Sequence, residues 1–300
     1  MNTLIDNLLD VFQGFRMPML PIDQFAQTGR AILADKMSTY IAKNVPIKFH
    51  MLGYPMKSPN TRDKVIGQVP DMGEEISIAN FGVFNAKIKE FYTPGVNVSI
   101  VSDGYVFNDI MQVSDNVVGL YNEMSKDIAK DQPVTWYELQ DFYSDNNINT
   151  MRDKVMNQFG ITTEILEQRI LLDPDVNELY RGMIKFMSMD LAIRPFDSNN
   201  QLHKAAKKVA REMMFRNEAY SRLVQSEFTD SIRLSMHPSI NNGTKYSFQL
   251  IPSQKAWTSP WHCAILLDNG EYVTIHKKDA EANGFELIYK NGQSHHYITN

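Results

Sequence analysis

Two short segments near residue 240 place polar side chains in rows that could form the floor of a binding site. Residues 231–238 and 245–250 alternate polar and apolar side chains with period two, which is typical of strands. The link between them contains Pro, two Asn and Gly, so we predict a hairpin that sets the polar rows side by side. The polar rows carry Arg233, Ser235, His237 and Lys245. Such a surface could bind an anion and transfer a proton, but antiparallel sheets also often have one solvated face.

Further polar residues lie directly before or after other predicted strands. They are Lys57, Ser58, Asn60, Lys64, Asp103 and His262. In open α/β sheets, ligands bind beyond the carboxyl ends of the strands, so these residues are candidates for a site. Each also has an ordinary alternative: Lys57 as a surface lysine, Asp103 as a turn residue and His262 as a core histidine. Neither GxGxxG nor GxxxxGK[ST] occurs, which argues against a standard dinucleotide or P-loop site.

The long helix predicted after Ser198 has one charged residue on its apolar stripe. Ser198 and Gln201 have the spacing of a capping box, and the stripe that follows is interrupted at Arg216. Because an unpaired buried charge is very costly, we predict that Arg216 faces inward and pairs with an acid or with a substrate anion.

The remaining histidines give no sign of a metal centre. None of the seven histidines forms HExxH, so no metal site is predicted. His295 and His296 lie in a polar C-terminal segment and are predicted to face solvent.

Composition narrows the class of protein. The chain has 300 residues, 43% of them hydrophobic and 22% charged, which is ordinary for a globular protein with a sizeable core. A net charge of −5 argues against a general nucleic-acid binder, and one cysteine, Cys263, excludes an internal disulfide. No apolar run approaches the roughly 20 residues that span a bilayer, and residues 1–15 read as a docked helix, not a signal peptide. A cytoplasmic protein is therefore expected.

These candidates must be positioned by alternating helices and strands. The patterns predict helices over 22–44, 74–91, 115–129 and 176–191, shorter helices within 136–172, and strands over 45–52 and 96–101. Three or four strands follow the long helix. We therefore expect a single α/β catalytic domain over 1–300, with a Rossmann-like mixed sheet that is parallel in the N-terminal part, antiparallel toward the C-terminus and flanked by helices.

Several motifs, in order, resemble those of the pyoverdine/dityrosine biosynthesis family, the isocyanide (isonitrile) synthases. The motifs span about residues 50–265 and are Tyr54-Pro55-Met56-Lys57-Ser58-Pro59-Asn60, Lys64-Val65-Ile66-Gly67, Pro70-Asp71-Met72-Gly73-Glu74, Tyr92-Thr93-Pro94-Gly95, Ser102-Asp103-Gly104-Tyr105-Val106-Phe107-Asn108-Asp109, Leu179-Tyr180-Arg181-Gly182, Ile232-Arg233-Leu234-Ser235-Met236-His237-Pro238 and Pro260-Trp261-His262. No single motif is diagnostic; their joint occurrence carries the resemblance.

The resemblance implies a reaction and its participants. Such enzymes join the amino group of tyrosine or tryptophan to the ketone of ribulose 5-phosphate, need no metal, nucleotide or redox cofactor, and often work beside an iron(II)/2-oxoglutarate oxygenase. The proton transfers are then expected of the catalytic candidates His237, Lys57, Asp103 and His262. Substrate binding is expected of Ser58, Asn60, Lys64, Arg181, Arg216, Arg233, Ser235 and Lys245, with Lys57, Ser58 and Asn60 at the phosphate.

Two other functions stay open from the residues alone. One is an aldolase or transferase that acts on a sugar phosphate without an amino acid, since the same cations would serve. The other is a metabolite-binding module that moves no proton. The choice between tyrosine and tryptophan cannot be predicted, because the shape of an aromatic pocket is not legible in the sequence.

Overall fold

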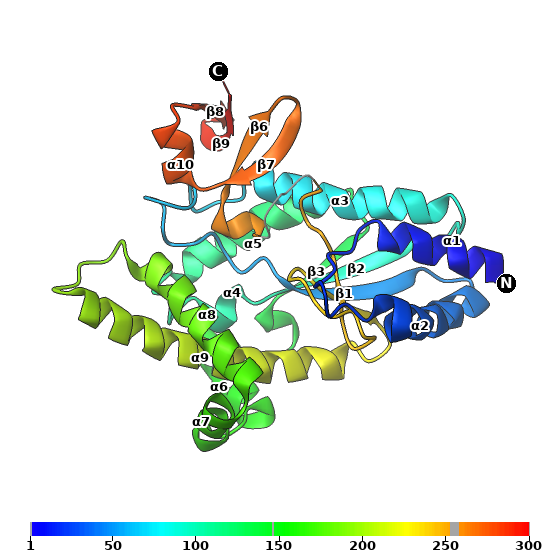
Figure 1. Ribbon diagram of the computed structural model, residues 1–300, viewed down its shortest axis with the longest axis horizontal. Coiled ribbons are helices and arrows are strands. Elements are labelled where there is room, and N and C mark those ends of the chain that lie inside the picture. Colours follow the sequence, from blue (N-terminus) through cyan, green and yellow to red (C-terminus); the bar gives the residue numbers. More distant parts are fainter. Residues whose placement is uncertain (1, 146, 253–257, 300) are drawn as a thin grey trace.

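The structure, a computed structural model, describes residues 2–145, 147–252 and 258–299, and contains two β-sheets (Figure 1). The first sheet has five strands in the order β3-β2-β1-β4-β5, all paired in parallel. Its strands are β1 (Ile47–Gly53), β2 (Val96–Ser102), β3 (Val134–Tyr137), β4 (Ile232–Ser235) and β5 (Tyr246–Ser247). The second sheet has four strands in the order β7-β6-β9-β8 and contains two antiparallel pairs. The predicted fold class, parallel first and antiparallel toward the C-terminus, is confirmed.

Helices cover both faces of the parallel sheet. They are α1 (Asn2–Gln13), α2 (Arg30–Lys43), α3 (Met72–Lys89), α4 (Gly104–Phe107), α5 (Asp115–Ala129), α6 (Ile148–Phe159), α7 (Thr163–Leu172), α8 (Pro174–Leu191) and α9 (Asn199–Glu227). Apolar residues of α1, α2 and α3 form one buried cluster with strands β1, β2 and β4. A second cluster joins α4, α6, α8 and α9, and Figure 1 shows α3 and α9 on opposite sides of the sheet.

Local capping explains why two of these helices begin where they do. Asp71 accepts a hydrogen bond from the backbone N–H of Gly73, and Glu74 accepts one from the backbone N–H of Asp71, which together cap α3. The Ser198 side chain accepts a hydrogen bond from the backbone N–H of Gln201 at the start of α9, as the sequence predicted.

Two predicted elements are wrong. Residues 134–137 form strand β3, although we predicted helices from residue 136. Strands β4 and β5 do not form a hairpin, because Leu234 and Ser235 pair in parallel with Tyr246 and Ser247. The link between these strands turns away to the N-terminal segment, where Asn241 donates a hydrogen bond to Asp23 (2.7 Å). Parallel pairing puts the carboxyl ends of β1, β2 and β4 at one edge of the sheet.

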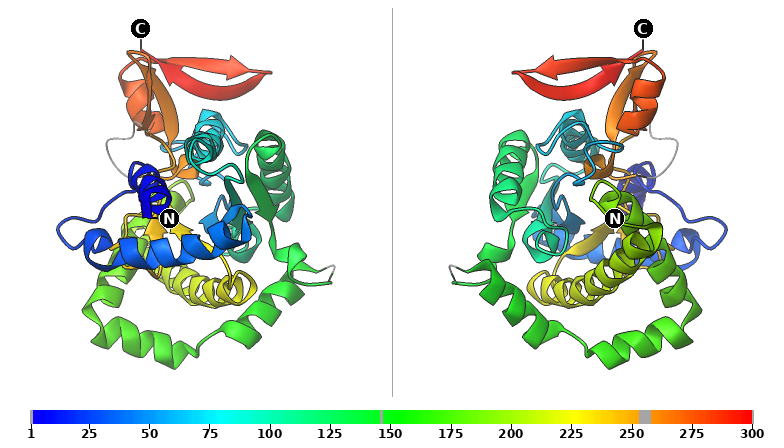
Figure 2. Two further views of the ribbon diagram at one scale, coloured as in Figure 1. Left: turned by 90° about the vertical axis from the view of Figure 1, so that its right-hand side faces the viewer. Right: turned by 90° about the vertical axis from the view of Figure 1, so that its left-hand side faces the viewer.

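The second sheet lies at one end of the molecule, beside the N-terminal part of α3 (Figure 2). Its strands are β6 (Ala264–Asp268), β7 (Glu271–Ile275), β8 (Glu286–Lys290) and β9 (Gln293–Ile298), with helix α10 (Lys277–Ala282) between β7 and β8. We predicted His295 and His296 in solvent, and this is wrong: they are 7% and 8% exposed. Both lie in β9. His295 Nε2 is 3.3 Å from Glu75 Oε2 in α3, and the His296 ring packs against Tyr272 of β7 with centroids 5.9 Å apart.

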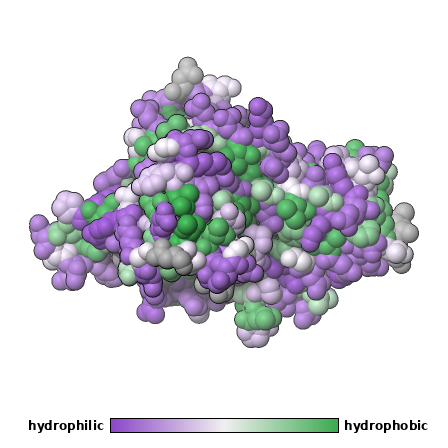
Figure 3. All heavy atoms as spheres, turned by 90° about the horizontal axis from the view of Figure 1, so that it is seen from above, coloured by the Kyte–Doolittle hydropathy of each residue, from purple (hydrophilic) through white to green (hydrophobic). Residues whose placement is uncertain are grey.

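Apolar side chains are mostly internal. The face shown in Figure 3 is largely hydrophilic, with smaller groups of hydrophobic side chains between the polar ones. Within the described ranges, no helix combines the length and the apolar character needed to cross a membrane.

Candidate active site

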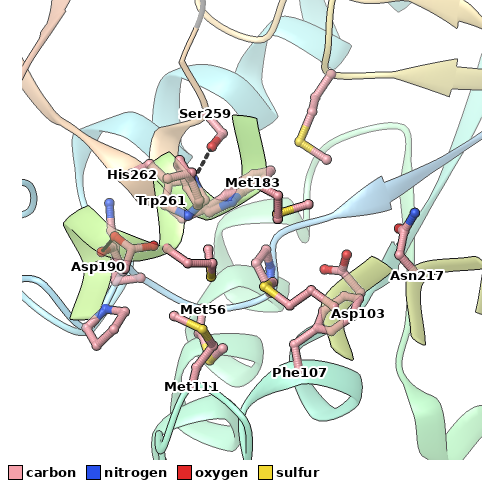
Figure 4. Close-up of a pocket in the computed structure, with 18 of the residues that line it drawn as sticks. Met56, Asp103, Phe107, Met111, Met183, Asp190, Asn217, Ser259, Trp261 and His262 are labelled. Atoms are coloured by element: carbon pink, nitrogen blue, oxygen red, sulfur yellow. Dashed lines mark hydrogen bonds between the residues drawn. The ribbon is translucent and has the colours of Figure 1, made fainter. Parts of the chain in front are cut away.

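A cavity of about 390 Å³ lies between the carboxyl edge of the parallel sheet and helices α8 and α9 (Figure 4). Segments after β1, β2 and β4 line it, together with α8, α9 and a short 3₁₀ helix, Pro260–His262. Six methionines form much of its wall: Met56, Met111, Met183, Met187, Met213 and Met236. Phe107, Phe186 and Trp261 add aromatic surface. The cavity is therefore mainly apolar, with a few polar groups at defined places.

Asp103 directs a carboxyl group into this cavity from the end of β2. Its Oδ1 atom is buried and has no hydrogen-bond partner among the described residues. Desolvation by the surrounding protein raises its pKa to about 7. Figure 4 shows the carboxyl near Phe107 and Asn217, facing the cavity. An acid of this pKa exchanges protons readily near neutral pH.

The backbone around Asp103 is fixed by close packing. Ser102 Oγ donates a hydrogen bond to Tyr54 O (3.0 Å), and Tyr220 Oη donates one to Ser102 O (2.9 Å). A Cβ atom at Gly104 would lie 2.1 Å from Pro55 O, so only glycine lets the segments after β1 and β2 approach this closely. These contacts hold Asp103 at the edge of the sheet.

Lys57 lines the cavity but is held by protein acceptors. Its Nζ lies 2.7 Å from Asp71 Oδ2, 2.7 Å from Glu74 Oε2 and 3.1 Å from Pro260 O, and its side chain is fully buried. Burial would lower the pKa of Lys57, but the charges of Asp71 and Glu74 raise it to about 12. An ammonium group has three donors, and these three acceptors use them. The structure therefore corrects the prediction that Lys57 contacts a phosphate.

The other polar residues after β1 anchor their loop to the end of α8. Ser58 Oγ donates a hydrogen bond to Asp190 Oδ1 (2.7 Å), and Lys64 Nζ lies 2.5 Å from the same oxygen. Asn60 Nδ2 donates one to Met189 O (2.7 Å). In this structure the side chains of Ser58 and Asn60 bond α8, and their contact with a phosphate stays a prediction. The sequence analysis missed Asp190, although an acid three residues after Met187 on an amphipathic helix was an available signal.

His262 and His237 both line the cavity. His262 Nδ1 is 2.6 Å from Ser259 Oγ, and its ring stands edge-on to Phe186 with centroids 4.6 Å apart. Desolvation first, and then the charge of Lys64, holds the pKa of His262 well below its usual range. Desolvation and then the charge of Lys245 lower the pKa of His237, and the exposure of its side chain to the open cavity limits that shift. Both imidazoles are therefore neutral near pH 7.

Arg233 and Lys245 add positive charge near His237. Desolvation lowers the pKa of Arg233, and desolvation followed by the charge of Arg233 lowers that of Lys245. Neither cation has an acidic side chain within 4.0 Å in the described part of the chain, and Arg233 Nη2 contacts Ser221 Oγ at 3.4 Å. Neither residue lines the cavity itself, and Ser235 Oγ accepts a hydrogen bond from the backbone N–H of His237 (3.2 Å). Their charges make this end of the site electropositive.

Two predicted substrate-binding residues lie elsewhere. Arg181 is exposed on α8 and does not line the cavity, although Gly182 beside it does. Arg216 faces inward as predicted and pairs with acids: its Nη1 is 2.6 Å from Asp109 Oδ1, and its Nε is 2.8 Å from Glu212 Oε1. Its role is therefore to join α9 to the turn after α4.

We expect Arg216→Lys to leave the KM of a phosphate-bearing substrate within about twofold of wild type, because the side chain bonds protein acids. The free energy of unfolding should fall by about 1–2 kcal/mol, since a lysine cannot reproduce the fork to Asp109 together with the bond to Glu212. Urea unfolding and steady-state kinetics measure the two effects. A tenfold rise in that KM with unchanged stability would instead place Arg216 at the substrate.

An α/β fold with a carboxyl group and two imidazoles in an apolar cavity at the strand ends defines an enzyme-type site for a small organic molecule. The family is shown by sequence: residues 37–288 match the family described as pyoverdine/dityrosine biosynthesis protein, and the chain belongs to it. This confirms the resemblance found in the motifs.

Relatives and a solved structure agree with this placement. The chain is 30% identical over 267 residues to L-tryptophan isonitrile synthase AmbI2 of Fischerella ambigua, covering 88% of this chain and 81% of that protein. It is 26% identical over 272 residues to the L-tyrosine isonitrile synthase of Xenorhabdus nematophila, again covering 88% and 81%. The crystal structure of the PvcA protein from Pseudomonas aeruginosa has the same fold, with a TM-score of 0.93 and 24% identity over 99% of this chain and 100% of that one.

Proposed function

We propose that the protein is an isocyanide synthase that joins the amino group of an aromatic L-amino acid, tyrosine or tryptophan, to the ketone of ribulose 5-phosphate. The sugar then fragments and leaves one carbon on the nitrogen as the isocyanide. Support comes from the family, from relatives named as isonitrile synthases for each of these two amino acids, and from the cavity. We expect the product to be consumed by an iron(II)/2-oxoglutarate oxygenase.

The methionine-lined cavity suits an aromatic side chain. Its volume, about 390 Å³, is within the usual range for small-molecule pockets. Methionine sulfur atoms make favourable contacts with aromatic rings, and flexible thioether chains adapt to rings of different size. The wall can therefore accept a phenol or an indole, which fits relatives that act on different aromatic amino acids.

The observation that carries the proposal is the unbonded carboxyl oxygen of Asp103 in this apolar cavity. With the aromatic ring among the methionines, the α-ammonium group can donate a hydrogen bond to Asp103 Oδ1. Transfer of that proton to Asp103 frees the nitrogen lone pair to attack the ketone carbon. A proton then moves from the nitrogen to the ketone oxygen, which becomes a hydroxyl. The protonated Asp103 returns its proton to this hydroxyl, so that water departs as the protonated C=N bond forms.

The histidines and the nearby cations have supporting roles in this proposal. His237 and His262 are neutral. His262 can accept a hydrogen bond from a sugar hydroxyl, and either imidazole can take a proton once a bound anion raises its pKa. The positive charges of Arg233 and Lys245 attract the amino-acid carboxylate toward the His237 end of the cavity.

The test is turnover with defined substrates. Purified protein incubated with ribulose 5-phosphate and either tyrosine or tryptophan should give an isocyanide, detected by its vibrational band and its mass. A sugar fragment without nitrogen would point to an aldolase. Binding of both compounds without any product would point to a metabolite-binding module.

A further inference from the structure

A second cavity, of about 460 Å³, lies between α8 and the C-terminal sheet. It is lined by Lys64, Phe186, Met189, Thr258, His262, Cys263, Thr274, Ile275, His276 and Asp279. Two of these residues, Phe186 and His262, also line the methionine-rich cavity. The two cavities therefore adjoin at the His262 imidazole and the Phe186 ring.

The chemistry of the two linings differs. The first cavity is mainly methionine and aromatic surface, whereas the second presents an ammonium, two imidazoles and two threonine hydroxyls. These groups can donate hydrogen bonds to a compound with several hydroxyl groups and an anionic end. An aromatic side chain would gain little binding free energy from such a wall, and a polyhydroxy compound would gain little from a wall of methionines.

The second cavity has a lysine ammonium on its inner side. After desolvation, the charge of Lys64 is the next cause that holds the pKa values of both His262 and His276 below their usual range. Lys64 Nζ is buried, 2.5 Å from Asp190 Oδ1 and 4.1 Å above the Phe186 ring, so it is held at the junction of the two cavities. The carboxylate of Asp279 lines the outer side, is 56% exposed, and lies 3.8 Å from His276 Nδ1. An ammonium group has three donors, so Lys64 can bond Asp190 and still donate to an anion on this side of the cavity.

We propose that this second cavity binds the phosphorylated sugar ketone, so that His262 lies between the sugar and the aromatic amino acid in the first cavity. The inference rests on the proposed function and adds a location for the second substrate. It also gives the C-terminal sheet a role, because Thr274 and His276 come from β7 and the residue after it. With the amine at Asp103 in the first cavity, the ketone end of the sugar would reach past His262 toward it while the phosphate end stays in the second cavity.

Calorimetry with ribulose 5-phosphate alone tests this inference, and steady-state kinetics follow. We expect Thr274→Val and His276→Gln each to weaken sugar binding by roughly three- to tenfold, the effect of losing one hydrogen bond. The KM for the sugar should rise by the same factor, while the KM for the amino acid stays within about twofold of wild type. Lys278→Gln is the matched control, because it removes an exposed charge beside His276 without removing a lining group.

The outcomes separate the two proposals. Sugar binding that is weakened by both lining variants and not by Lys278→Gln supports the inference, whether or not an isocyanide is formed. Unchanged sugar binding in both lining variants, no sugar binding by the wild type, or a rise confined to the amino-acid KM overturns it. Intact sugar and amino-acid binding without isocyanide would contradict the proposed function alone.

Discussion

Replacing Asp103 by asparagine is expected to lower kcat by about 10²- to 10⁴-fold, the usual range for loss of a general acid–base group. The amide keeps the size of the side chain but cannot accept the substrate's ammonium proton. The wild-type carboxyl combines a buried, unbonded oxygen with a pKa of about 7, so it is the group best suited to this transfer. Steady-state kinetics with ribulose 5-phosphate and each aromatic amino acid measure the change.

The pH profile tests the same assignment. A base must be deprotonated, so wild-type kcat/KM should fall as the pH drops through about 7, and Asp103→Asn should lose that inflection. Asp109→Asn is the matched control, because Asp109 pairs with Arg216 and does not line the cavity. It should lower stability and leave kcat near the wild-type value. A folded Asp103→Asn protein with near-normal kcat would move the role to His237 or His262.

Asp103→Asn should lower activity but raise the stability of the fold. The pKa of Asp103 is raised by folding, so its ionisation opposes the folded state, and that penalty grows as the pH rises from about 4 to about 7. Asp103→Asn removes the buried charge and should therefore raise the free energy of unfolding at pH 8 while activity is lost. Urea unfolding at pH 8 checks the sign, and a clear loss of stability would show that Asp103 has a structural partner.

Local sequence patterns predicted elements better than their pairing. Helix α5 lies over the predicted residues 115–129, and β2 is within one residue of the predicted strand, because periodic apolar positions are a local property. The direction in which β4 and β5 pair depends on the route of their ten-residue link, which bonds the N-terminal segment through Asn241. Period-two alternation carries no information on that route.

The candidate site was predicted only in part, because some of its contacts are local in the sequence and others are not. Asp103 and His237 line the cavity because the ends of parallel strands meet at one edge of the sheet, and His262 reaches it from the 3₁₀ helix before β6. The partners of the two buried lysines could not be predicted, because Lys64 pairs with Asp190, a residue 126 positions away. The six methionines that line the cavity come from five separate segments of the chain, and only Met183 and Met187 share a helix.

The second large effect is expected at Lys57, and it concerns stability. Lys57→Met should lower the free energy of unfolding near pH 8 by about 3–5 kcal/mol, because removing one partner leaves buried charge without compensation. Glu74 Oε1 also accepts a hydrogen bond from Tyr121 Oη (2.9 Å), and Asp71 Oδ1 accepts one from the Gly73 N–H (2.8 Å), so both carboxyls are fixed in place. Urea unfolding measures the change.

The pH dependence of unfolding and a second substitution distinguish the loss of charge compensation from a simple packing defect. In the wild type, desolvation already raises the pKa of Asp71 to about 7, and loss of the Lys57 charge raises it further. An acid whose folded-state pKa is raised destabilises the fold most at high pH, so the loss in Lys57→Met should be smaller at pH 5 than at pH 8. Adding Glu74→Gln to Lys57→Met should restore part of the free energy of unfolding, because it removes one uncompensated buried charge. If the loss came only from a cavity left by the lysine, Glu74→Gln would restore nothing. Lys154→Met breaks an ion pair near the surface and should change the free energy of unfolding by less than about 1 kcal/mol. A loss that small in Lys57→Met would show that the buried cluster contributes little.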